Sequence, residues 1–262
     1  MTINSPDTEV PTPAVETHLL GQIDFDTALT LQERLVRRIA ARDDGQICLL
    51  LCEHPPVVTV GRSGTAGDIL LESDMLRRQR IEVRWVKRGG GCLVHAPGQL
   101  AVYPIVPLRW HGFSVGEYLD RFQAGLMNTL DELNFPVHAR PDRRAIYGRT
   151  GRLADFGVAV RDWVTYHGAF INVCPSMGLF RLVQSDRGEH DKASCLMAER
   201  RQPARMTTLR AALIRHLADS FGCDRYHLHT GHPLLTTGRL CFSMTQLRET
   251  CYAVSVQTKG MI

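Results

Sequence analysis

Three successive glycines, Gly89 to Gly91, separate two apolar segments and constrain how this chain of 262 residues can fold. Residues without a Cβ adopt positive φ and allow backbone N–H groups to approach a ligand closely. Residues 81–86 alternate apolar and polar side chains, and residues 100–108 are mostly apolar, so both segments are predicted strands. We therefore predict a hairpin whose glycine loop, between Arg88 and His95, forms the floor of a binding site. A hairpin with a flexible tip and no ligand is the alternative.

The other elements are predicted from hydrophobic periodicity. Apolar residues at helical spacing predict three amphipathic helices, at residues 26–42, 114–133 and 206–222. Short apolar runs predict central strands at residues 46–52 and 57–60, with Pro55 and Pro56 between them.

The segment RGGGCLVHAPGQLAVYPI, at residues 88–105, resembles a signature of the octanoyltransferases of lipoate synthesis. In that signature RGG is followed by H-x-P-G-Q-L and YP, and the family is part of the biotin/lipoate protein ligase superfamily. EHPPVVTVGR at residues 53–62 resembles the family's EHPPVYTLGR, and residues 26–35 resemble its first helix. TYHGAFINV at residues 165–173 resembles its HGLALNV strand. The resemblance covers roughly residues 17–222.

The resemblance implies an α+β fold in which a mixed, mainly antiparallel sheet is packed with helices. Residues 17–222 would form the acyltransferase domain. Residues 1–16 contain three prolines and few large apolar side chains, which predicts a disordered arm. Residues 223–262 would be a C-terminal extension of unknown role, in which residues 240–256 form a helix or a pair of strands packed on the sheet.

The resemblance also implies a reaction, the transfer of an octanoyl group from acyl carrier protein to a lysine of a lipoyl domain, without a diffusible cofactor. Expected acceptors are the glycine cleavage H protein and the E2 subunits of 2-oxoacid dehydrogenases. Carried over onto this chain, the residues that bind the acyl group are Arg88, Gly89, Gly90, Gly91, Cys92, Leu93, Val94, His95, Asp155, Phe156, Gly157, Gly168, Ala169 and Phe170. Phe170 stands where the family has a smaller residue, so we expect a narrower pocket and a shorter or differently shaped acyl group.

Two positions depart from the family pattern. Arg152 stands where the family has a lysine, and Ser185 stands where the family has its nucleophilic cysteine. An arginine stays protonated and cannot act as a neutral base, while a serine hydroxyl is a poor nucleophile without one. Cys195 is expected at a helix N-terminus, where a thiolate is stabilised. Cys195 and Arg152 are therefore the candidate catalytic residues, with Cys92 as a second candidate thiol.

Two other functions remain open. A catalytically inactive relative that binds acyl groups or lipoyl domains would explain why both catalytic residues are replaced while the binding loop is intact. An ATP-dependent lipoate or biotin protein ligase would need no enzyme thiol. Such ligases, however, resemble this family in requiring the lysine that Arg152 replaces.

Composition sets broad limits on partners and location. The chain has 31 Lys and Arg against 27 Asp and Glu, a net charge of +4, which suits an acidic protein partner but falls short of a nucleic-acid binder. No apolar run approaches the ~20 residues of a membrane span, and no signal-peptide pattern is present, so we expect a cytoplasmic protein. The eight cysteines lack paired metal-site spacing and are predicted to be reduced. His227 and His229 would share one strand face near His232, but no third acid or cysteine is evident there, so no metal site is predicted.

Overall fold

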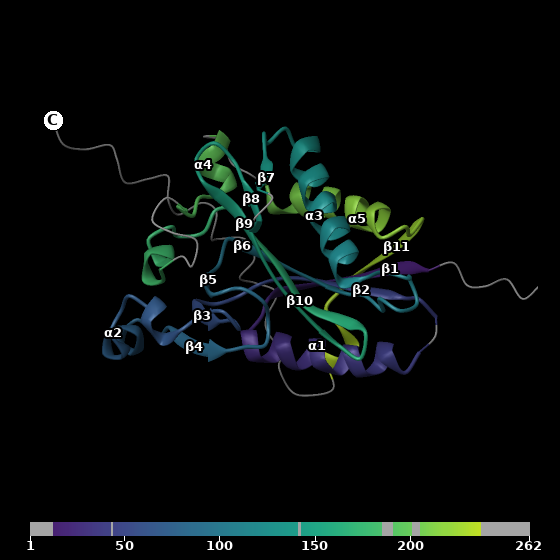
Figure 1. The fold of residues 1–262 in the computed structure, drawn as a ribbon, viewed down its shortest axis with the longest axis horizontal. Helices are drawn as coiled ribbons and strands as arrows, with labels where there is room; N and C mark the ends of the chain where they lie inside the picture. The colour runs from purple at the N-terminus through teal and green to yellow at the C-terminus, as the bar shows by residue number, and fades with distance from the viewer. Residues whose placement is uncertain (1–12, 43, 141–142, 185–190, 201–204, 237–262) are drawn as a thin grey trace, which may run out of the picture.

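The computed structural model describes residues 13–42, 44–140, 143–184, 191–200 and 205–236. They form two β-sheets with helices on both sides of the larger one (Figure 1). The α+β prediction is confirmed. None of the helices in these ranges has the length and apolar character needed to cross a membrane.

The larger sheet has eight strands in the order β11-β1-β2-β6-β10-β9-β8-β7. β11, β1 and β2 run parallel to one another, and the remaining neighbours are antiparallel, so the sheet is mixed and mainly antiparallel as predicted. The strands are β1 (Ala14–Gln22), β2 (Ile47–Glu53), β6 (Gln99–Ile105), β7 (His138–Arg140), β8 (Arg143–Tyr147), β9 (Arg152–Arg161), β10 (Val164–Asn172) and β11 (Arg225–Thr230).

Strand β2 explains why this part of the sheet is covered on both faces. Its side chains alternate between two apolar clusters, because successive residues of a strand point to opposite faces. Ile47, Leu49 and Leu51 enter the cluster under the helices at residues 115–132 and 206–220, and Cys48 and Leu50 enter the cluster under the helix at residues 25–40. A nearly continuous apolar run is what a strand buried on both faces requires.

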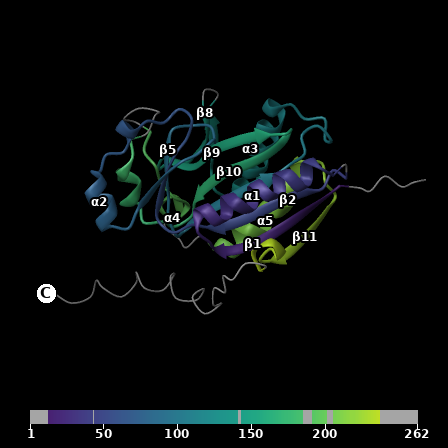
Figure 2. The same cartoon turned by 90° about the horizontal axis from the view of Figure 1, so that it is seen from below.

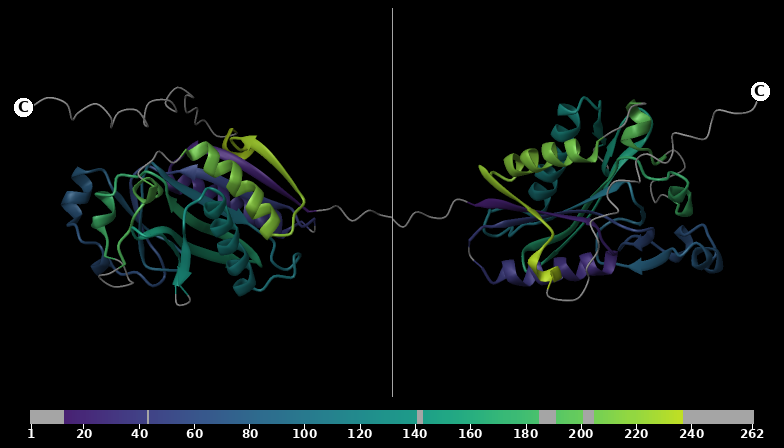
Figure 3. Two further views of the ribbon diagram at one scale, coloured as in Figure 1. Left: turned by 90° about the horizontal axis from the view of Figure 1, so that it is seen from above. Right: turned by 180° about the vertical axis from the view of Figure 1, so that it is seen from behind.

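Helix α1 (Phe25–Ala40) covers one face of the sheet, and α3 (Val115–Glu132) and α5 (Met206–Ser220) cover the other (Figures 2 and 3). Asp24 and Ser114 cap α1 and α3 by accepting hydrogen bonds from backbone N–H groups of the first turn. All three helices lie within two residues of their predicted positions. The shorter helices are α2 (Ser73–Arg78), α4 (Leu196–Arg200), α6 (Pro233–Thr236) and two 3₁₀ turns, Ala66–Asp68 and Leu179–Leu182.

The smaller sheet corrects the predicted hairpin. It contains β3 (Val57–Val60) between β4 (Glu82–Trp85) and β5 (Cys92–His95). The strand before the glycines therefore pairs with β3 and not with the strand at residues 100–108, which is β6 of the larger sheet. The glycine loop connects two outer strands of one sheet, and the Pro97-Gly98 turn leads to the other sheet.

The edge of the larger sheet changes both predicted domain boundaries. Ala14 and Val15 are buried in β1, so residues 14–16 belong to the sheet and not to a disordered arm. β11 pairs with β1 in parallel, so part of the C-terminal extension also belongs to the sheet. Residues 1–12 and 240–256, for which an arm and a further element were predicted, lie outside the described residues.

Gly168 offers a test of the contact between β6 and β10. A Cβ at this position would lie 1.9 Å from the carbonyl oxygen of Val102. Gly168→Ala should therefore lower the free energy of unfolding by about 3 kcal/mol or more, because two backbones must separate. Gly116→Ala, in the first turn of α3 with its nearest neighbour at 3.9 Å, should instead be neutral or stabilise by up to about 1 kcal/mol. Urea unfolding of both variants measures the contrast, and equal effects would contradict this contact.

Candidate active site

Arg88 is the most deeply buried charged side chain of the glycine loop, with no exposed surface. Its Nε and Nη2 atoms donate to Thr59 Oγ1, Nη2 also donates to Thr59 O at 2.8 Å, and Nη1 donates to Gly89 O at 2.9 Å. A buried cation needs such partners, because its loss of hydration is otherwise uncompensated. The guanidinium thus ties the glycine loop to β3 from inside the protein.

A continuous series of hydrogen bonds runs from Arg88 through the interior. His95 Nδ1 lies 3.1 Å from the side-chain oxygen of Gln99 and therefore donates to it. The other ring nitrogen, Nε2, is then an acceptor, and Thr59 donates to it at 2.8 Å. Gln99 donates to Asn172 at 2.9 Å, and Asn172 donates to the backbone oxygen of Ser194 at 3.0 Å. We call this series the relay; its members are Arg88, Thr59, His95, Gln99, Asn172 and Ser194.

The relay joins segments that are distant in the sequence. β3, β5, β6 and β10 each contribute a polar side chain, and each of these side chains is at least 96% buried. Its last member, Ser194, immediately precedes Cys195. The structure therefore brings the glycine-loop motif, the 165–173 strand motif and the candidate nucleophile into one connected unit.

Aromatic rings surround His95 and keep water away from it. Phe170 packs against His95 with ring centroids 4.4 Å apart, and Phe25 stacks at 5.5 Å. Burial, together with the nearby His54 and Arg88, holds the pKa of His95 well below its usual value. His95 therefore takes part in the relay as a neutral imidazole. Phe170 is 1% exposed and packs beside His95.

The glycine loop is itself held by backbone hydrogen bonds. Gly89 N–H donates to Val158 O of β9, and the carbonyl groups of Gly90 and Gly91 accept from Ser63 and Gly61. Gly90 has φ +82°, which a residue with a Cβ rarely adopts. The loop is thus a fixed element. Leu93 lies on the α1 side of β5, and Val94 lies in the cluster that includes Val58 and Leu76.

The strand residues carried over as acyl contacts divide between the two faces of β9 and β10. Gly157 pairs with Gly168, and a Cβ on Gly157 would lie 2.7 Å from Arg88 Cδ, so this glycine makes room for the buried arginine. Phe156 and Ala169 belong to the cluster under α3, where Phe156 meets Phe122 at 5.2 Å. Phe170 belongs to the opposite cluster.

Arg152 lies between two carboxylates. Its Nε is 2.9 Å from Asp155 Oδ1, and its Nη1 pairs with Asp191. Burial disfavours the charge, but the two carboxylates outweigh burial and raise the pKa of Arg152. We call Arg152, Asp155 and Asp191 the arginine clamp. Because its two negative charges exceed the single positive one, the arginine's charge is already compensated within the clamp.

Cys195 lies next to this clamp along the backbone. Arg152 N–H donates to Lys192 O, and Ser194 N–H donates to Arg152 O, so the two candidate catalytic residues come from adjacent segments. Cys195 is 3% exposed and directly precedes α4, as predicted, although α4 has only five residues. Glu199 of α4 accepts from Thr150 Oγ1 at 2.6 Å and from the backbone N–H groups of Arg149 and Thr150. This carboxylate fixes the turn before β9 to α4.

Cys92 does not share a face with His95. Its thiol donates to Thr65 O at 3.6 Å, whereas His95 contacts Phe170 and Thr59. Alternate residues of a strand point to opposite sides, and these two are three positions apart on β5. Cys92 therefore lies on the opposite face of β5 from His95.

Several residues of the site were missed from the sequence. Gln99 and Asn172 are polar residues inside apolar strands, a pattern that indicates a buried hydrogen-bonded pair. Thr59 lies inside the apolar run of β3. Asp191 lies in an irregular segment, where no periodicity marks it. Ser185, the expected position of the family's cysteine, lies outside the described residues.

Comparisons with known proteins support one family. The model of the lipoyl protein ligase A/B catalytic domain matches residues 24–220. This chain belongs to the lipoyl protein ligase A/B catalytic domain family. It is 40% identical over 161 residues to an octanoyltransferase of Geotalea uraniireducens, covering 62% of this chain and 72% of that protein. It is 34% identical over 197 residues to an octanoyltransferase of Syntrophotalea carbinolica, covering 75% of this chain and 90% of that protein.

Solved structures of ligases share the fold of this lipoyl protein ligase A/B domain. The structure of this chain resembles that of lipoate-protein ligase A bound with ATP, with a TM-score of 0.68 at 14% identity over 85% of this chain and 92% of that one. It resembles the bipartite lipoate protein ligase of Thermoplasma acidophilum with the same TM-score, at 14% identity over 86% and 90%. At this identity the likeness establishes the shared fold.

The arginine clamp predicts a large cost for losing its cation. Arg152→Met removes the cation that lies between two buried carboxylates, so the free energy of unfolding should fall by about 3–5 kcal/mol. Arg77→Met removes an exposed pair with Asp74 and should change it by less than about 1 kcal/mol. Chemical unfolding monitored by circular dichroism measures both. Similar small effects would show that the clamp contributes little to stability.

The buried histidines predict a loss of stability in mild acid. Burial lowers the pKa of His54 to about 4 and that of His167 to about 3. The unfolded chain takes up these protons below pH ~6.5 while the folded protein does not, so stability is intact above that pH and falls toward pH ~4. Each such histidine contributes up to about 1.4 kcal/mol per pH unit.

His54→Gln should reduce the slope of unfolding free energy against pH in this range. In the native protein His54 donates to Ile23 O and accepts from Tyr103 at 2.7 Å. His138→Gln, on exposed strand β7, is the matched control and should leave the slope unchanged. An unchanged slope in His54→Gln would show that this histidine does not resist protonation.

Proposed function

We propose that this protein transfers an octanoyl group from acyl carrier protein to a lysine of a lipoyl domain. The observation that carries this proposal is its 34% identity with a protein named octanoyltransferase across 90% of that protein's length. Lipoyl domains such as those of the glycine cleavage H protein and 2-oxoacid dehydrogenase E2 are the proposed acceptors. A cytoplasmic location is part of the proposal.

Cys195 is the proposed nucleophile. Its sulfur would attack the thioester carbonyl of the octanoyl carrier, so that a new carbon–sulfur bond forms and the carrier thiol leaves with the proton. The acceptor lysine amine would then attack the octanoyl thioester, forming the amide and regenerating the Cys195 thiol. The connection of Cys195 to the glycine loop through the relay supports this assignment.

The arginine clamp favours a second candidate, a protein that binds acyl groups or lipoyl domains without transferring them. A nucleophilic thiol is activated by a nearby uncompensated cation or by a general base. Arg152 stands at the family's lysine position, and both Asp155 and Asp191 compensate its charge. The two candidates differ in whether an acyl-enzyme forms.

Intact-protein mass spectrometry after incubation with octanoyl acyl carrier protein separates these candidates. We expect a hydroxylamine-labile octanoyl adduct on the wild type and on Cys92→Ser, and its loss in Cys195→Ser. Cys92→Ser is the matched control, because it removes a buried thiol that contacts Thr65 instead of the relay. Ser185→Ala tests the position aligned with the family's cysteine.

Three outcomes would contradict the proposal or its details. An adduct that persists in Cys195→Ser but disappears in Ser185→Ala would assign the nucleophile to Ser185. No adduct on any form, with lipoyl domain still bound, would favour the binding protein. Thermal stabilisation that requires ATP and octanoate together would favour a ligase.

A further inference from the structure

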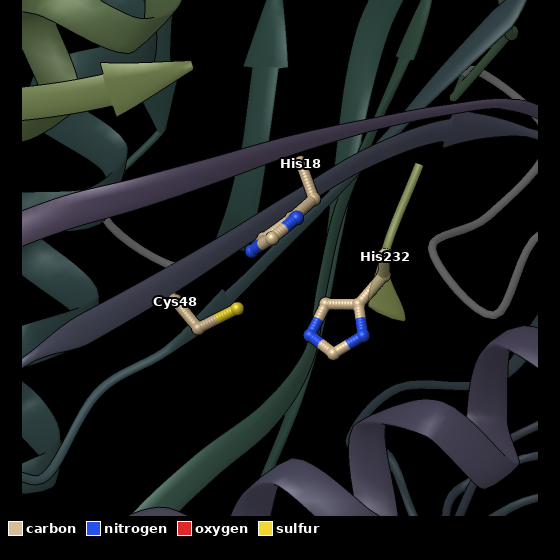
Figure 4. Close-up of side chains that lie close together, drawn as sticks. All are labelled: His18, Cys48 and His232. Atoms are coloured by element: carbon tan, nitrogen blue, oxygen red, sulfur yellow. The ribbon is translucent and has the colours of Figure 1, made fainter. Parts of the chain in front are cut away.

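Three potential metal ligands converge beside the edge of the larger sheet, and none of them is a relay residue. His18 of β1, Cys48 of β2 and His232, which directly precedes α6, each present one ligand atom, and these atoms lie within 4.8 Å of one another (Figure 4). All three side chains are buried. His18 and Cys48 were not candidate metal ligands in the sequence, because they are far along the chain from the histidines at residues 227–232.

The first ligand is oriented by a hydrogen bond of the kind found around metal sites. His18 Nδ1 donates to the carbonyl oxygen of Gly231 at 2.9 Å, which leaves the lone pair on Nε2. Metal-ligating histidines usually donate their other N–H to a carbonyl or carboxylate in this way. His229 stacks on His18 with ring centroids 5.0 Å apart and further restricts the ring.

The second histidine lies against the first, with ring centroids 4.4 Å apart. Leu234 N–H donates to His232 Nδ1 at 3.1 Å, so Nε2 carries the proton in the metal-free protein. Binding an ion through Nε2 would shift this proton to Nδ1 and exchange the Leu234 hydrogen bond for a metal–nitrogen bond. Figure 4 shows the Cys48 sulfur directed into the space between the two rings.

The space between these groups is part of a cavity of about 180 Å³. Arg38 and Arg42 of the cavity wall add positive charge, which opposes a cation. Glu16, also in the wall, and a deprotonated Cys48 add two negative charges, which offset the two positive charges of the arginines. Besides these residues the cavity is lined by Leu35, Ile39, Gln46, Ile47, Pro233 and the two histidines.

We propose that His18, Cys48 and His232 bind one zinc ion, with water as the fourth ligand. Thiolate and imidazole donors are the set that zinc prefers in tetrahedral sites. Zinc bonds of about 2.0–2.3 Å place tetrahedral ligand atoms about 3.3–3.8 Å apart, so the three groups must close by roughly 1 Å. On binding, the Cys48 thiol proton is released to solvent, and the sulfur–metal bond replaces the S–H bond.

The ligands' positions give this site a structural consequence. β11 joins the sheet by pairing with β1, and all of its side chains are exposed. A metal bound by β1, β2 and the segment after β11 would fasten this outer strand to the sheet. Zinc binding should therefore protect the backbone amides of β11 from hydrogen exchange.

Cobalt substitution tests the site directly. The full-length protein, stripped with chelator and titrated with Co²⁺, should bind one equivalent in a tetrahedral site, with intense visible bands and a thiolate-to-cobalt charge-transfer band. Added Zn²⁺ should displace the cobalt and remove both. Absence of the charge-transfer band in the wild type would overturn the proposal.

Single substitutions assign the ligands. Losing an outer-shell partner of a metal site costs about 10–100-fold in affinity, and losing a direct ligand should cost more. Cys48→Ala and His232→Ala should therefore weaken zinc binding by at least about 100-fold. His227→Ala removes an exposed histidine of β11, five residues before His232, and should stay within about twofold of the wild type. Circular dichroism checks that each variant folds.

His232→Ala decides the question if Cys48→Ala does not fold, because His232 lies outside the sheet. Unchanged zinc affinity and an unchanged cobalt spectrum in folded His232→Ala would overturn the proposal. So would an equal loss of affinity in His227→Ala, because binding would then follow the number of histidines and not the cavity.

Discussion

The buried guanidinium of Arg88 is the interaction on which the surrounding structure depends. A guanidinium without exposed surface needs fixed hydrogen-bond acceptors, and Thr59 and Gly89 supply them. A Cβ on Gly157 would lie 2.7 Å from Arg88 Cδ, and a Cβ on Gly61 would lie 2.3 Å from Gly90 O and 2.7 Å from Arg88 Nη1, so both glycines make room for the loop that holds Arg88. The glycine-rich motif therefore has a structural role in enclosing an arginine, in addition to any contact with an acyl group.

Arg88 donates its hydrogen bonds to neutral groups, whereas Arg152 is paired with two carboxylates. His95 stays neutral beside Arg88, so the relay orients side chains without moving net charge. At the clamp, Asp155 and Asp191 hold a second buried cation next to the segment that ends in Cys195. Both arrangements favour a single rigid geometry, since a partly satisfied buried polar network is costly. The chemistry proposed for Cys195 must work within this rigid, nearly dry environment.

Much of the fold was predictable from local patterns. The amphipathic helices α1, α3 and α5 follow from apolar residues at helical spacing, and β2 and β3 follow from apolar runs. The pairing of β4 with β3 was not predictable, because alternation within a strand does not specify its neighbour. The candidate active site was likewise only partly predictable from the sequence. The glycine loop, Arg152 and Cys195 stand in recognisable motifs, while Asp191 and Thr59 become site residues only through contacts made on folding.

From its sequence alone this chain is assigned to its family and fold class, because the motifs and the hydrophobic periodicity are local and survive substitution elsewhere. Its departures from the family at Arg152 and Ser185 are equally plain in the sequence. Only the tertiary structure decided that Arg88 faces inward and that His18, Cys48 and His232 meet. Each depends on which strands become neighbours, and that choice is made by burial summed over the whole sheet and not by any one segment.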